Sequence, residues 1–110
     1  MTVIRTERWM TPALSSVRLQ YMHADQVTAP PDRATLLGGT RHCPVAMFRS
    51  GPNLLGIEAH PEFPAAYARA LIEDRRERIG TQAADDALAR VDEPTDARAV
   101  GEWIAHFLGA

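Results

Sequence analysis

The sequence predicts an α/β fold, in which a small mixed or antiparallel sheet from residues 1 to 60 is followed by three helices. Two observations carry this prediction. Apolar residues alternate with polar ones in short stretches before Pro61, which is the period of a half-buried strand. After Pro61 the apolar residues recur every three or four positions, which is the period of an amphipathic helix.

Short strands are expected in the first half because prolines and glycines divide it into brief segments. Val17, Leu19 and Tyr21 alternate with polar residues and predict a strand that ends near residue 23. A second short strand is expected over residues 34–37. Residues 45–49 and 54–60 flank Gly51-Pro52-Asn53 and predict a hairpin.

Three helices are expected in the second half. Pro64 suits the first turn of a helix over residues 64–78, and Gly80 suits its end. A shorter helix follows Thr81, whose hydroxyl could cap it. Pro94-Thr95-Asp96 opens the last helix, which Gly109 ends.

The composition is that of a single globular domain over residues 1–110, with 45% hydrophobic and 24% charged residues. No apolar run is long enough to cross a bilayer, and the start lacks the pattern of a signal peptide, so a cytoplasmic chain is expected. The arginines are interspersed with acids and the net charge is −2, which argues against nucleic-acid binding.

The residue types best suited to chemistry lie at the end of the hairpin, where His60 is followed by Pro61 and Glu62. Side chains at strand ends are held by the sheet yet remain reachable, and proline restricts the backbone between them. A histidine with a carboxylate partner is two thirds of a nucleophile, base and orienter set. In the alternative interpretation, His60 is a structural strand-end histidine and Glu62 an acid at a helix N-terminus.

Two segments together resemble class I glutamine amidotransferases. Gly56-Ile57-Glu58-Ala59-His60-Pro61-Glu62 is similar to the family's Gly-x-Gln-x-His-Pro-Glu, with Glu58 in place of the more usual Gln. Upstream, His23-Ala24-Asp25-Gln26-Val27 resembles a His-x-Asp-x-Val segment found in many members. The resemblance covers residues 17–108 and implies one part of a three-layer domain, its carboxyl-terminal part.

The resemblance implies that His60 is the general base and acid of glutamine side-chain amide hydrolysis, and that Glu62 orients it. It places Met22 and His23 beside the glutamine substrate. The family's nucleophilic Cys stands in a Gly-x-Cys-x-Gly elbow, which this chain lacks. The expected partner is therefore an amino-terminal half that bears the Cys, or a synthetase. A non-catalytic remnant or interaction module of the same fold is the alternative.

An incomplete sheet should also leave apolar residues uncovered. We expect a partner surface to cover Val17, Leu19, Val45 and Ile57, so self-association or binding of the missing half is predicted.

Cys43 is the single cysteine, and it offers a second interpretation of the nucleophile. Arg41 and His42 could lower the pKa of its thiol if they lie nearby, but Cys43 lacks flanking glycines and suits a small packed thiol better. Neither a metal nor another cofactor is expected, since no local pair has the spacing of a zinc motif. The side chains of metal-ligand type are His23, Asp25, His42, Cys43, His60 and Glu62.

Overall fold

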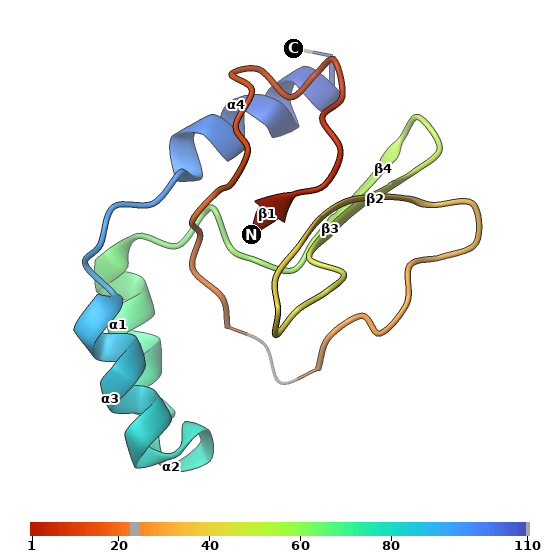
Figure 1. Cartoon of the computed structure of the whole chain (residues 1–110). Coiled ribbons are helices and arrows are strands. Elements are labelled where there is room, and N and C mark those ends of the chain that lie inside the picture. The colour runs from red at the N-terminus through yellow and green to blue at the C-terminus, as the bar shows by residue number, and fades with distance from the viewer. Residues whose placement is uncertain (23–24, 110) are drawn as a thin grey trace. The chain divides into compact units, whose positions relative to one another are not determined.

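The computed structural model describes residues 1–22 and 25–109, which form an α/β chain with a four-stranded antiparallel sheet (Figure 1). The sheet order is β1-β2-β3-β4, so each strand pairs with its neighbour in sequence. The strands are β1 (Thr2–Val3), β2 (Thr35–Gly39), β3 (Met47–Ser50) and β4 (Leu54–Ile57). The sheet was predicted as mixed or antiparallel, and every strand pair is antiparallel. The β3–β4 hairpin around residues 51–53 is confirmed, although β4 ends at Ile57 and not at residue 60.

The chain divides into two units. The first unit contains Met1–Pro61 and the carboxyl-terminal segment from Thr95, and the second contains Glu62–Pro94. The first unit therefore holds the sheet together with the last helix, α4 (Ala97–Phe107).

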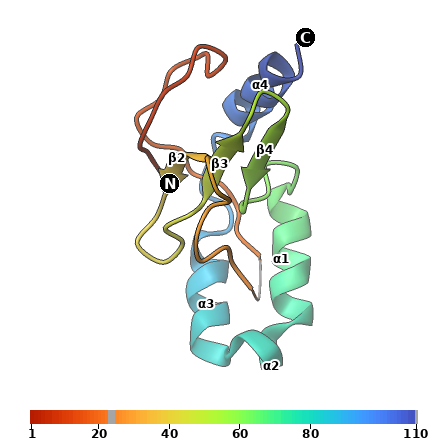
Figure 2. The same ribbon diagram turned by 90° about the vertical axis from the view of Figure 1, so that its right-hand side faces the viewer.

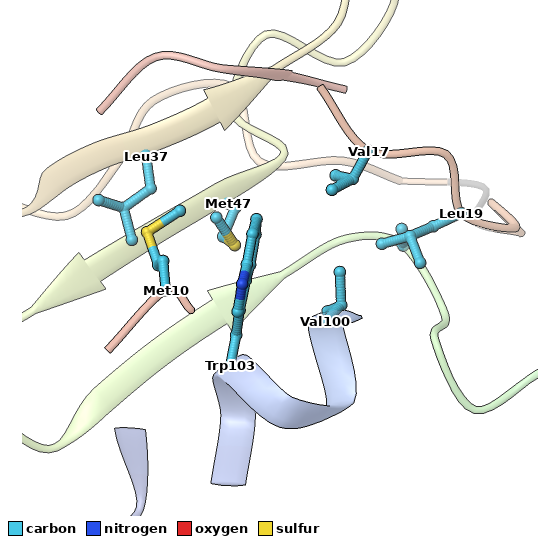
Figure 3. Close-up of a cluster of buried hydrophobic side chains, with 8 residues drawn as sticks. Met10, Val17, Leu19, Leu37, Met47, Val100 and Trp103 are labelled. Carbon is cyan, nitrogen blue, oxygen red and sulfur yellow. The ribbon is translucent and has the colours of Figure 1, made fainter. Parts of the chain in front are cut away.

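The core of the first unit lies between the sheet and α4. Val100 and Trp103 point from α4 toward Met47 of β3 and Leu37 of β2 (Figure 3). Trp103 is only 1% exposed, and its indole N–H donates to the carbonyl oxygen of Pro12 at 2.8 Å, so its one polar atom is satisfied. Burial of these side chains is the main term that stabilises this unit.

Over the described residues 17–22, the predicted strand is wrong as an element, although its burial pattern is right. Val17 and Leu19 are buried, yet the segment makes only isolated bridges, at Ser16 and Gln20. The reason lies at Arg18, whose backbone N–H donates to Asp96 Oδ2 at 2.7 Å and whose carbonyl accepts from the Asp96 N–H at 2.8 Å. The start of α4 thus occupies the backbone groups that a strand ladder would need.

The expected apolar surface is also not formed by the residues named for it. Val17, Leu19 and Val45 are buried and Ile57 is half-buried. The first two belong to the core cluster that includes side chains of α4, so the chain itself covers them.

The second unit consists of helices, and α1 and α3 lie side by side with α2 joining them (Figure 2). The helices are α1 (Ala65–Asp74), α2 (Arg76–Ile79) and α3 (Thr81–Arg90). The single helix predicted over residues 64–78 is therefore interrupted. Arg75, with φ −105° and ψ 15°, leaves helical geometry and redirects the chain into the one turn of α2.

Two details of the predicted helix ends are wrong and two are confirmed. Pro64 precedes α1 in an extended conformation instead of forming its first turn, and Thr81 lies inside α3 without a capping bond. Gly80 ends α2 at φ 98°, a conformation that favours glycine, and Gly109 follows α4 at φ 88°.

Candidate functional site

His60 stands just beyond β4, where its backbone is held by a strand-like contact. The N–H of Glu58 donates to the carbonyl of Ala46 at 2.9 Å, which continues the hairpin past Ile57. The N–H of His60 then donates to the carbonyl of Gln20 at 2.7 Å, in an isolated antiparallel bridge. The histidine is half-buried, so the sheet fixes its backbone while part of the residue remains accessible.

The glycine that opens this motif has a packing role. A Cβ on Gly56 would lie 2.5 Å from the ring of Phe48, the residue that faces it across the hairpin. The aromatic ring therefore requires glycine at this position. The hairpin therefore accounts for the first residue of the motif.

Glu62 lies in the second unit, two residues before the proline that precedes α1, and is exposed. The expected contact between His60 and Glu62 stays a prediction, because the two residues belong to different units. Of the two residues expected beside glutamine, Met22 is half-buried and follows the Gln20 bridge closely. His23 lies outside the described residues.

Cys43 is buried, with 3% of its surface exposed, and lies in a turn between β2 and β3. Its N–H donates to the hydroxyl of Thr40 at 2.7 Å, and its Sγ lies 4.0 Å from the carbonyl oxygen of Val45. Burial raises the pKa of the thiol, and the charge of Glu58 raises it further.

The less favoured alternative, in which neighbouring cations activate Cys43, is therefore contradicted. Arg41 and His42 are exposed, whereas the thiol is turned into the protein. A thiol with a raised pKa is mostly protonated near neutral pH and is a poor nucleophile. Cys43 behaves as the packed thiol of the alternative interpretation.

Glu58 is a residue whose role the sequence analysis missed. Its Oε1 accepts a hydrogen bond from the N–H of Val27 at 2.9 Å, although the two residues are far apart in sequence. Burial, with smaller contributions from Cys43 and Glu58, raises the pKa of Tyr21 to about 12. The only signal in the sequence was that Glu58 stands where class I glutamine amidotransferases more usually have Gln.

The described part of the chain contains no group of three or more His, Cys, Asp or Glu side chains arranged to hold a metal ion. Within those same residues, no helix is long and apolar enough to span a membrane.

Comparisons with protein-family models, with curated proteins and with solved structures each gave no match for this chain.

Proposed function

We propose that this chain supplies the His and the Glu of a Cys-His-Glu triad that hydrolyses the side-chain amide of glutamine. The observation that carries the proposal is the position of His60. It lies beyond the end of β4, after Glu58 and Ala59, and its N–H donates to the carbonyl of Gln20 at 2.7 Å. A general base works best when its backbone is fixed and its ring is reachable.

The chemistry divides between this chain and a partner. A Cys thiol of the partner loses its proton to His60, and the thiolate attacks the amide carbon of glutamine. His60 then gives the proton to the departing nitrogen as the C–N bond breaks, which releases ammonia and leaves a thioester that water hydrolyses. Glu62 orients the imidazole and stabilises its cationic form.

The proposal assigns the sheet to one side of a larger three-layer amidotransferase domain. Its amino-terminal half would contribute the Cys elbow and the donors that stabilise the tetrahedral oxyanion. The ammonia would pass from there to an acceptor on a synthetase. The buried state of Cys43 supports a nucleophile from outside this chain.

Reconstitution tests this assignment. Ammonia release from glutamine is measured after mixing the chain with a Cys-bearing amino-terminal half of a class I amidotransferase. His60→Ala should lower the rate by about 100-fold or more, as loss of a proton carrier does. Glu62→Ala should lower it less, because an orienting residue acts through the one that it orients.

His42→Ala is the matched control, since His42 is exposed and lies outside the motif. It should leave the rate unchanged. Equal rates for wild type and His60→Ala in an active mixture would remove His60 from the catalytic role.

A non-catalytic interaction module is the second candidate, and the lack of a reactive thiol in this chain favours it. It predicts that the chain binds the Cys-bearing half without restoring ammonia release. Binding measured by calorimetry together with the ammonia assay separates the two candidates.

A further inference from the structure

The segment that carries Met22 is attached to the His60 end of β4 at two points. At one end, the carbonyl of Gln20 accepts the N–H of His60 at 2.7 Å. At the other end, the N–H of Val27 donates to Oε1 of Glu58 at 2.9 Å. Only Ala59 separates Glu58 from His60, so Gln20 and Val27 are both attached to the short stretch that follows β4.

The two attachments differ in kind. The Gln20–His60 contact is a backbone bridge, which any residue types can make. The Val27 contact depends on a side chain, and it is a hydrogen bond to a carboxylate, which is stronger than one between neutral groups. The charge of Glu58 also raises the pKa of both Tyr21 and Cys43, which places the carboxylate near those two side chains.

We propose that Glu58 is a positioning residue, which clamps the described residues 20–22 and 25–27 against the end of β4 and so forms the wall of the glutamine site beside His60. This inference rests on the proposed function and deepens it. The glutamine side chain would enter between His60, which acts on it, and the segment that Glu58 holds.

The first test uses the chain alone and follows hydrogen exchange at the Val27 amide by nuclear magnetic resonance. Glu58→Ala should speed this exchange by about tenfold or more, because it removes a charge-assisted hydrogen bond. Glu58→Gln retains an acceptor and should restore most of the protection. Glu77→Gln removes the same charge from an exposed side chain of α2 and should leave Val27 exchange unchanged.

Unchanged exchange at Val27 in Glu58→Ala would overturn the clamp. If Glu58→Ala fails to fold, Glu58→Gln provides the test of the clamp. The clamp predicts that in Glu58→Gln the Val27 amide loses part of its protection from exchange, while the other amides of the first unit keep theirs. Val27 exchange identical to wild type in Glu58→Gln, together with an unfolded Glu58→Ala, would also count against it.

The second test separates positioning from a purely structural role. In the reconstituted enzyme, Glu58→Ala should raise the KM for glutamine by about tenfold with kcat nearly unchanged, and Glu58→Gln should rescue it. A lowered kcat at unchanged KM would overturn the assignment to the substrate wall. Failure of the wild-type mixture to release ammonia would sink the proposed function, whereas the exchange experiment would still decide the clamp.

Discussion

The two units of this chain are stabilised in different ways. The first unit buries large side chains, among them Trp103, Met10 and Met47, each at most 1% exposed. The buried side chains of the second unit are Ala68, Ile72, Ala84 and Val91, and no aromatic residue is among them. Burial of apolar area sets the scale of stability, so the first unit should be the more resistant to unfolding.

The ionic contacts differ in the same way. In the first unit, Arg49 binds both carboxylate oxygens of Glu7, at 2.6 and 2.7 Å, and both side chains are at most 25% exposed. In the second unit, Arg76 pairs with Asp85 at 2.7 Å, but these side chains are 34% and 57% exposed. Exposed pairs contribute little, because water and salt screen them and their side chains must be ordered.

The largest loss of stability is expected when Trp103 is replaced. Trp103→Ala should lower the free energy of unfolding of the first unit by about 3–5 kcal/mol, since it leaves a cavity and removes the bond to Pro12. Urea unfolding followed by circular dichroism measures this. Trp9→Phe, at a half-buried residue whose ring meets Phe107 edge-on at 5.2 Å, is the milder control. A loss below about 1 kcal/mol for Trp103→Ala would contradict the assigned core.

A smaller effect is expected at Glu7. Glu7→Gln should lower the free energy of unfolding by about 2 kcal/mol at neutral pH, because it removes the charge that pairs with the half-buried Arg49. The hydrogen bond from Arg49 holds the pKa of Glu7 below its ordinary value of 4.5. This stabilisation is therefore fully present above pH 4.5 and is lost as the pH falls through the lower pKa of the folded state.

Urea unfolding of wild type and Glu7→Gln at several pH values measures this difference. The gap in unfolding free energy should narrow on acidification. A gap that stays constant from neutral pH down to about pH 2 would show that Glu7 does not titrate with a lowered pKa.

The smallest effect is expected in the second unit. Arg76→Gln removes the exposed pair with Asp85 and should leave the helical circular dichroism and the unfolding midpoint close to wild type. A loss as large as that of Glu7→Gln would show that exposed ion pairs matter more in these helices than the comparison implies.

The elements that were predicted best are those in which the apolar periodicity and the turn or end residues of the sequence indicate the same structure. The β3–β4 hairpin has alternation on both sides of Gly51, and α4 has apolar residues on one face and a glycine after its end. The strand predicted from Val17 was wrong because alternation reports burial, while the backbone partner of Arg18 came from Asp96, far along the chain. Periodicity cannot reveal such a partner.

In the candidate site too, features with a local sequence signal were predictable and features that depend on distant contacts were not. His60 at a strand end was predictable from the motif and from the change of period after Pro61. The role of Glu58 was not, because it depends on a contact with Val27 that no local pattern encodes. The lack of glycines beside Cys43 favoured a packed thiol, and the structure agrees, although the contact of its N–H with Thr40 could not be predicted from the sequence.

The most direct test of the proposed function is ammonia release from glutamine by the purified chain, alone and after addition of a Cys-bearing amino-terminal half. We predict no release above background from the chain alone, because burial raises the pKa of its single cysteine thiol, Cys43, and release after the half is added. Hydrolysis by the lone chain that Cys43→Ser abolishes would contradict the account and make Cys43 the nucleophile.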